Sequence, residues 1–351
     1  MQYFSDIIFI GTYSVIAFVL TFCTAPFFIR FLYHHHIGKQ IRDTATDGKA
    51  ATIFQQLHKK KAGTPTMGGV LIWGVTLLTV ILSRFMSYMG WIEKSLLQRR
   101  ETYLPLATLL ATAILGAIDD IYNIKGLGKS KGINVKPKFL WLTLFAGIGA
   151  WWFFYKLGYN SVHIPRLGDF EIGVWYIPLF MLVIISTANA VNITDGLDGL
   201  AGGLLMIAFG AFGIIAYAKG LIYLTALCSV ISGALAAFLW FNVAPAQFYM
   251  GDTGSLSLGA TLGVIAMLTN ALVPLLLIGG IFVIETMSVI LQLFSKKYVH
   301  KKIFKVAPLH HHFEAMGWPE HTVVFRFWII GGVLAVIGVI IGLVGMGNIA
   351  V

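Results

Sequence analysis

Apolar runs long enough to cross a lipid bilayer dominate this sequence. A helix needs about 20 mostly apolar residues to cross the hydrocarbon core, which is ~30 Å thick. Because backbone groups in lipid must be satisfied within the segment, continuous apolar runs predict helices rather than a barrel. The sequence predicts a single all-α, polytopic membrane domain over residues 1–351, with about ten helices. We expect these spans at 7–32, 67–88, 103–118, 139–155, 174–193, 200–218, 221–240, 256–270, 272–294 and 324–346.

Composition excludes an ordinary soluble domain. Hydrophobic residues make up 58% of the chain and charged residues only 11%. The two cysteines, Cys23 and Cys228, fall inside expected spans, which predicts buried thiols and no disulfide framework. The first span lacks a basic segment before it and a small-residue cleavage site after it. We therefore expect a retained helix rather than a signal peptide.

The distribution of basic residues predicts the orientation in the membrane. Loops after odd-numbered spans carry 17 Lys and Arg residues, whereas loops after even-numbered spans carry seven. The positive-inside rule then places the odd loops in the cytoplasm and both termini in the periplasm. The net charge of +10 is thus mainly a topology signal, and we expect no nucleic-acid partner.

Five unusual polar stretches all fall in odd, cytoplasmic loops. The outer loops contain nothing comparable, so we expect one composite site on the cytoplasmic face. The stretches are "KKKAGTPTMGG" (59–69), "AIDDIYN" (117–123), "NAVNITDGLDG" (189–199), "WFNVAPAQFYMGDTGS" (240–255) and "APLHHHFE" (307–314).

Carboxylates are the most informative members of these stretches. Asp119 and Asp120 are adjacent, so they repel each other unless a cation or protons share them, although a hydrated helix end is the alternative. Asp252 lies between glycines at an expected helix start, which suits Mg²⁺, an ion that takes one or two carboxylates besides water and phosphates. Asn192 and Asp195 are helical neighbours at a spacing of three, whereas Asp198 is expected to cap the following helix.

Each of the remaining groups of residues has two interpretations. His310, His311 and His312 are consecutive and point in different directions, which suits zinc poorly but allows donation to phosphate oxygens. The lysines after Asp120 are either phosphate ligands or topology signals. The aromatic pair Phe248–Tyr249 either stacks a base or packs at the membrane interface.

Taken together and in this order, "TPTMGG", "DD", "NAVNITDGLDGLA", "FNVAPAQFYMGDTGSL" and "PLHHHFE" closely resemble the phospho-N-acetylmuramoyl-pentapeptide transferase family, MraY. That family belongs to the polyprenyl-phosphate N-acetylhexosamine-1-phosphate transferases. The resemblance covers nearly the whole chain. It implies a dimeric, Mg²⁺-dependent, multi-pass enzyme of the bacterial inner membrane. The implied reaction moves phospho-MurNAc-pentapeptide from its UDP carrier to undecaprenyl phosphate, giving lipid I and UMP in peptidoglycan synthesis.

The resemblance also implies roles for individual residues. One departure concerns Asn123, because many family members carry lysine at that position. Catalytic roles fall on Asp119, Asp120, Asp252, His310 and His311, with Asp252 also the Mg²⁺ ligand. Substrate binding falls on Lys61, Thr64, Lys138, Asn192, Asp195, Gly196, Asn242, Tyr249 and His312.

Two other functions compete with this interpretation. A UDP-GlcNAc transferase acting on the same lipid would share the acidic motifs, but "PLHHHFE" favours the muramoyl donor. A polytopic transporter would place ionisable residues near the bilayer midplane at broken helices, whereas here the acids collect at one interface. Glu285, inside the ninth span, is the exception, and either a helix contact or a site facing lipid phosphate would account for it.

Overall fold

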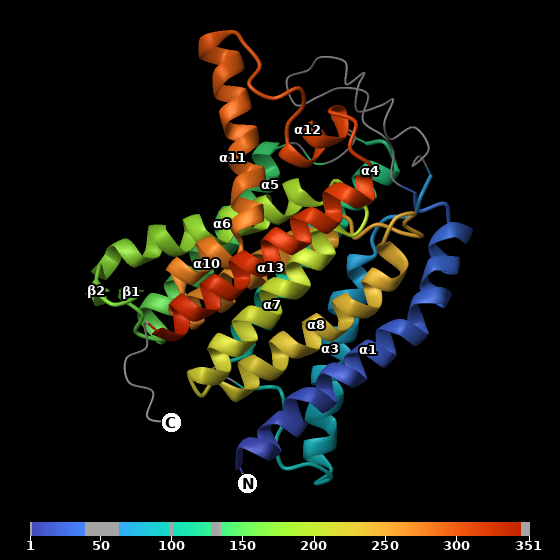
Figure 1. Ribbon diagram of the computed structural model, residues 1–351. Coiled ribbons are helices and arrows are strands. Elements are labelled where there is room, and N and C mark those ends of the chain that lie inside the picture. The colour runs from blue at the N-terminus through green and yellow to red at the C-terminus, as the bar shows by residue number, and fades with distance from the viewer. Residues whose placement is uncertain (1, 39–62, 99–100, 128–132, 134, 345–351) are drawn as a thin grey trace.

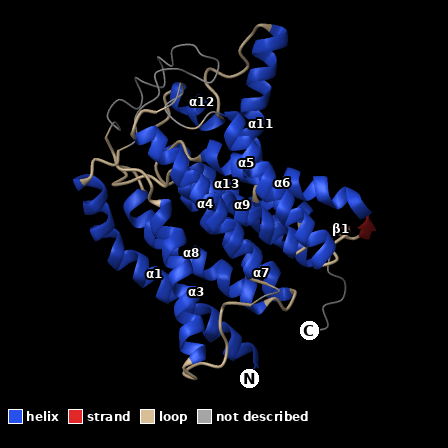
Figure 2. Ribbon diagram, turned by 180° about the vertical axis from the view of Figure 1, so that it is seen from behind, coloured by secondary structure: helices blue, strands red, loops and turns tan. Residues whose placement is uncertain are grey.

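The computed structural model describes residues 2–38, 63–98, 101–127, 133 and 135–344, and most of them are helical (Figures 1 and 2). Two short π-helical turns, Trp152–Lys156 and Ser295–Val299, and a 3₁₀ turn, Gly173–Trp175, adjoin longer helices. The helices are α1 (Gln2–His34), α3 (Gly69–Tyr88), α4 (Tyr103–Ile124), α5 (Val135–Trp151), α6 (Tyr176–Thr194), α7 (Leu200–Ala218), α8 (Ile222–Asn242), α9 (Asp252–Leu268), α10 (Leu272–Ile278), α11 (Gly280–Phe294), α12 (Leu309–Ala315) and α13 (Glu320–Val344).

The all-α, polytopic character predicted from the sequence is confirmed. Seven helices of the described chain are long and apolar enough to cross a membrane, or eight if a bent pair forms one span. The other expected ranges, 139–155 and 256–270, overlap α5 and α9, each of which has 17 residues and begins four residues earlier than expected. Every expected range therefore contains a helix or a helix pair, but fewer than ten satisfy the length of a span.

Three local features differ from the sequence-based expectations. The range 272–294 is two helices, α10 and α11, bent by 78° at Gly279. A two-stranded antiparallel hairpin, β1 (Ser161–Ile164) and β2 (Gly168–Glu171), joins α5 to α6, with Val162 opposite Phe170. Both cysteines are free as expected, but Cys23 is exposed on α1 whereas Cys228 is buried.

Helix α9 forms the centre of the bundle. All its residues from Thr253 to Leu268 are buried, and it packs mainly against α4 and α6. Small residues allow this close packing: a Cβ on Gly116 of α4 would overlap the backbone of Asp252, and one on Gly259 would overlap the backbone of Thr187. Large apolar side chains of α1 and α13 point outward instead, as expected for a surface in contact with lipid.

The helix connections gather at two opposite ends of the bundle. At one end, Lys94 pairs with Asp6 at 3.4 Å, and the backbone N–H of Leu224 donates to Glu101. The N-terminal end of α1 and the C-terminal end of α13 lie on the lower side of Figure 1, whereas α12 lies on the upper side. The described residues of all five polar stretches meet at the end that includes α12, through the contacts described below; residues 59–62 of the first stretch lie outside the described residues.

Candidate active site

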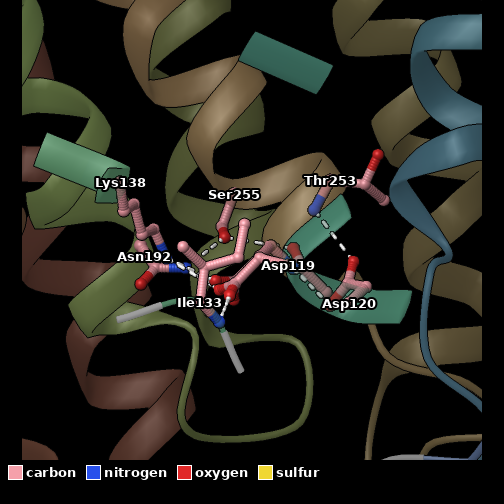
Figure 3. Close-up of polar contacts among 9 residues, drawn as sticks. Asp119, Asp120, Ile133, Lys138, Asn192, Thr253 and Ser255 are labelled. Atoms are coloured by element: carbon pink, nitrogen blue, oxygen red, sulfur yellow. Dashed lines mark hydrogen bonds and ion pairs between the residues drawn. The ribbon is translucent and has the colours of Figure 1, made fainter. Parts of the chain in front are cut away.

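Three charged side chains from different helices meet at the polar end of the bundle, which is the end that includes α12. Figure 3 labels two of them, Lys138 and Asp119. Lys138, in the first turn of α5, lies with its Nζ 3.1 Å from Asp119 Oδ2 and 2.5 Å from Asp252 Oδ2. Asp119 is nearly buried near the end of α4, and its Oδ1 also accepts a hydrogen bond from the backbone N–H of Ile133. The side chain of Asp252 retains 20% exposure. One ammonium thus joins two carboxylates, of which one is partly open.

Asp120 holds Asp252 in place. Its two carboxylate oxygens accept hydrogen bonds from the backbone N–H groups of Asp252 and Thr253, each at 3.0 Å, in the first turn of α9. The first N–H groups of a helix lack partners within the helix, so a carboxylate there satisfies them and opposes the positive end of the helix dipole. The preceding residue, Gly251, has a φ of 74°, a conformation that favours glycine. Asp120 therefore fixes the start of α9.

Asn192 of α6 completes the surroundings of Asp252. Its side-chain amide donates to Asp252 Oδ1 at 2.9 Å and to the hydroxyl of Ser255 at 2.8 Å. Ser255 in turn donates to the carbonyl of Gly251. Both carboxylate oxygens of Asp252 are therefore oriented by donors from neighbouring helices, which fixes the direction of this side chain.

The "TPTMGG" loop lies against the "FYMG" segment through backbone hydrogen bonds. Gly68 N–H donates to the carbonyl of Tyr249 at 2.7 Å, and Tyr249 N–H donates to that of Pro65 at 2.8 Å. Thr64 and Tyr249 are half-buried in this junction. Phe248 is fully buried and packs edge-on against Phe238, so it belongs to the core rather than to a base-stacking surface. Lys61 lies outside the described residues.

Asp198 and Asn242 join the loop after α6 to the loop after α8. The N-cap of α7 is Gly199, with a φ of 82°, so the expected capping role of Asp198 is wrong. Asp198 Oδ2 instead accepts from the N–H of Ala246 at 3.0 Å. Asn242 accepts from the N–H of Gly199 and donates to the carbonyl of Phe248. Both side chains therefore brace the loops that carry Asp195 and Gly196.

The three consecutive histidines have three different surroundings. Nδ1 of His310 lies 3.0 Å from Oε2 of Glu285, and Nδ1 of His311 lies 2.7 Å from Oε2 of Glu314. Nδ1 of His312 instead accepts a hydrogen bond from the backbone N–H of Lys305. The ring of His310 also touches Gly196, because a Cβ at that position would overlap Nε2. This contact joins α12 to the loop after α6.

Sequence reasoning singled out Glu285 without choosing between a helix contact and a site facing lipid phosphate, and it missed Glu320. Glu285 contacts His310 of α12, which is the helix contact. Glu320, at the start of α13, accepts from the N–H of Asp198 at 2.8 Å. Each is distant in sequence from its partner and belongs to no polar run, so only the packing of helices identifies it. Asn123 is nearly buried, whereas Lys125 is exposed.

The carboxylates of this site fit a divalent cation that takes only one or two ligands from the protein. No group of three or more His, Cys, Asp or Glu side chains within the described ranges is placed to hold a metal ion. Asp252 and Asp119 supply adjacent carboxylates near a partly open position. Hard cations with few protein ligands complete their coordination with water and substrate phosphates. Asp252, with Asp119 beside it, is the candidate ligand for such an ion.

The part of the chain that carries this acidic, lysine-bridged cluster matches a family of glycosyl transferases. Residues 103–270 match the model of glycosyl transferase family 4, and residues 61–72 match signature 1 of the phospho-N-acetylmuramoyl-pentapeptide-transferases. The region matched by the family model includes α4 to α9, which carry Asp119, Lys138, Asn192 and Asp252.

Full-length relatives define the family more narrowly. A phospho-N-acetylmuramoyl-pentapeptide-transferase of Chloroflexus aggregans is 40% identical over 343 residues, covering 93% of this chain and 88% of the relative. Those of Desulfosudis oleivorans and Bacillus pumilus are 40% and 38% identical, covering 93% of this chain and 90% and 96% of theirs. The chain belongs to the phospho-N-acetylmuramoyl-pentapeptide-transferase family, and it is therefore a membrane transferase.

Proposed function

We propose that this protein transfers phospho-MurNAc-pentapeptide from UDP-MurNAc-pentapeptide to undecaprenyl phosphate, forming lipid I and releasing UMP. An oxygen of the lipid phosphate attacks the phosphorus that carries the sugar, and the bond from that phosphorus to the oxygen bridging it to UMP breaks. The observation that carries the proposal is the cluster of Asp119, Lys138 and Asp252, within a chain of this family.

The charges of this cluster suit the proposed reaction. Bringing a phosphate to a diphosphate assembles several negative charges, which repel each other unless cations lie among them. Lys138 supplies one positive charge, and His310 and His311 are additional donors. Mg²⁺ bound at Asp252 would offset the charge of the diphosphate and of the departing UMP. Lys61, Thr64, Asp195, Gly196, Asn242, Tyr249 and His312 are proposed to surround the nucleotide and sugar.

The sequence-based interpretation makes Asp119 the candidate base for the acceptor, with orientation of groups or covalent nucleophilic attack as the alternatives. A phosphate monoester has a second pKa near ~6 and is largely dianionic at neutral pH, so direct attack requires no proton removal. Asp119 then serves to hold Lys138 and to orient the acceptor. The short distance between Asp119 and Lys138 supports this positioning role.

The lipid acceptor explains a membrane location. Its hydrocarbon tail remains in the bilayer while its phosphate reaches the interface, where the polar end of the bundle lies. We propose that this end faces the cytoplasm in a bacterial inner membrane, that both termini face the periplasm, and that α5 and α9 also cross the membrane to give ten passes. The basic residues of the odd loops support this orientation. We further propose a homodimer, as the family resemblance implies.

The test is UMP release by purified protein in detergent with undecaprenyl phosphate and Mg²⁺. We expect turnover with UDP-MurNAc-pentapeptide, none with UDP-GlcNAc, and loss of turnover when EDTA removes the metal. Turnover of UDP-GlcNAc alone would overturn the substrate assignment. If a folded protein released no UMP from either donor, the proposed function would be wrong.

A further inference from the structure

Helix α11 leaves the bundle with polar side chains on its inner face. Its axis is bent by 78° from that of α10, and its far end projects beyond the other helices (Figures 1 and 2). The buried side chains of α11 and of the turn after it include Glu285, Ser288, Gln292 and Ser295. Their spacing of three or four residues places them on one face of the helix. The polar face thus points inward, which is the reverse of a helix that packs on an apolar core and faces water.

The outer surface of α11 is apolar. Met287, Ile290, Leu291, Leu293 and Phe294 have between 44% and 58% exposure. An α-helix rises about 17 Å from residue 283 to residue 294, which is close to half the ~30 Å thickness of a bilayer's hydrocarbon core. The apolar part of α11 is therefore long enough to reach across the hydrocarbon of one leaflet.

Lysines begin where this apolar part ends. Lys296 and Lys297 lie in the π-helical turn Ser295–Val299, and Lys301 and Lys302 come directly after it and His300. The side chains of Lys297, Lys301 and Lys302 are exposed. Residues 286–313 contain five lysines and no Asp or Glu. The positive charge at this end of α11 is therefore not balanced by acidic residues of the same stretch.

Hydrogen bonds from the inner face of α11 hold the two lysine pairs together. The hydroxyl of Ser295 donates to the carbonyl of Lys301 at 2.9 Å. The side chain of Gln292 accepts from the N–H groups of Ile303 and Phe304, each at 3.0 Å, and donates to the carbonyl of Phe304 at 2.8 Å. The segment that carries the second lysine pair is therefore fixed beside the end of α11, next to the first pair.

We propose that this lysine end of α11 binds the headgroups of anionic phospholipids, while the apolar side chains of α11 lie among their acyl chains. Lipid phosphates supply the negative charge that this stretch of chain lacks, and each lysine near a membrane surface favours anionic lipid about fivefold. Tyr298 and Ile303, with 61% and 55% exposure, lie among the lysines. Aromatic and apolar side chains beside lysines are typical of the boundary between headgroups and hydrocarbon. This inference goes beyond the proposed function and does not depend on it.

Two other occupants fit this surface less well. A nucleic acid would be attracted by the lysines, but it would leave the apolar side chains of α11 in water. A second copy of the chain, packed symmetrically at this end, would bring two sets of lysines together, and like charges repel. Only an anionic lipid matches both the charge and the apolar surface.

Photocrosslinking of the full-length protein in phosphatidylcholine vesicles tests the preference. The vesicles contain a trace of photoreactive phosphatidylglycerol, which is anionic, or of phosphatidylcholine with the same reactive group near its headgroup, and mass spectrometry maps the labelled peptides. Residues 287–303 should be labelled at least about 10-fold more by phosphatidylglycerol. This preference should fall when the salt concentration is raised from about 0.05 M to about 0.5 M, because salt screens exposed charges.

Two variants of equal net charge assign the preference to the lysines. Replacing Lys297, Lys301 and Lys302 by Gln should make the two lipids label residues 287–303 nearly equally. The matched control replaces three other exposed basic residues by Gln, namely Lys125, Lys156 and Arg166. The control should keep the full preference for phosphatidylglycerol at residues 287–303.

Three results would overturn the proposal. Equal labelling by both lipids in the unsubstituted protein, or equal loss of preference in both variants, would show that these lysines do not select anionic headgroups. Absence of labelling at residues 287–303 would mean that a protein surface covers α11. Displacement of the label by undecaprenyl phosphate at a far lower mole fraction than by phosphatidylglycerol would assign the surface to the acceptor lipid. None of these measurements requires turnover, so they would decide the question even if the protein released no UMP.

Discussion

Lys138 joins two carboxylates that would otherwise repel each other. Asp119 reaches it from α4 and Asp252 from α9, and the Lys138 side chain retains only 16% exposure. In this partly closed setting, charges interact more strongly than in bulk water. The ammonium therefore stabilises the meeting of α4, α5 and α9 as well as supplying a positive charge for phosphate oxygens.

Lys138→Met should lower the thermal unfolding midpoint in metal-free detergent, because it leaves two neighbouring carboxylates without their counter-charge. The expected cost is about 1–3 kcal/mol, less than for a fully buried pair. Added Mg²⁺ should restore more stability to the variant than to the unsubstituted protein. The same substitution at exposed Lys125 should change neither value. Equal Mg²⁺ effects in both proteins would argue against a shared cation position.

Asp252→Asn should mainly reduce turnover, whereas Asp120→Asn should mainly reduce stability. Asp252 is the candidate metal ligand, so its variant should lose at least about 100-fold in turnover while its unfolding midpoint changes little. Asp120→Asn keeps one acceptor oxygen and places an amide donor near the N–H groups of α9, which should cost about 1–3 kcal/mol in stability. Unfolding curves and UMP release distinguish the two. Near-normal activity of Asp252→Asn would exclude the metal role.

At the scale of helices, α9 determines where the candidate site forms. Gly116 allows α4 to approach the first turn of α9, because a Cβ there would overlap the backbone of Asp252 and Thr253. Gly69 of α3 approaches Gly254 in the same way. The position of the acidic residues therefore depends on the closeness of helices that meet through glycines.

Gly116→Ala should displace the start of α9 and reduce both stability and turnover. Overpacking of this kind typically costs about 1–3 kcal/mol. Gly210→Ala in α7 is the matched control, since nothing lies within 4 Å of its added Cβ. That variant should retain both properties. If Gly116→Ala behaved like Gly210→Ala, close contact between α4 and α9 would not govern the site.

The helices were predictable from sequence where apolar content alone determines them. Each expected range contains a helix, because continuous apolar residues in lipid leave the backbone few alternatives. The 78° break at Gly279 was not predictable, since the apolar run continues through it. The pairing of Glu285 with His310 joins residues 25 positions apart on different helices. Such pairings depend on tertiary packing, which a single sequence does not encode as a local pattern.

The sequence predicted that the polar residues gather in one region better than it predicted the role of each residue. The described residues of the five polar stretches do meet. The expectation of one composite site rested on the fact that all five stretches fall in odd-numbered loops. Asp198 shows the limit: Asp is common at helix starts, but the backbone at Gly199 occupies the N-cap and Asp198 binds the loop after α8 instead. Local propensity could not distinguish these two partners.

At the scale of the molecule, the two ends of the bundle have different chemistry. The polar end collects the acidic cluster and the paired histidines. The opposite end has the Lys94–Asp6 pair and the β1–β2 hairpin, where His163 N–H donates to Asn270. This polarity agrees with the proposed reaction, in which a soluble nucleotide arrives from one side of the membrane and a lipid from within it.

The orientation can be tested on intact spheroplasts with a membrane-impermeant amine reagent, followed by mass spectrometry. Lys94 and Lys156 lie in even loops and are accessible in the structure, so both should be labelled from outside. Lys125 and Lys305 are also exposed but lie in odd loops at the polar end, so they should react only after lysis. All four lysines are thus exposed, and the two pairs differ only in the side of the membrane on which we expect them. Labelling of Lys125 and Lys305 before lysis would reverse the proposed orientation and place the candidate site outside the cell.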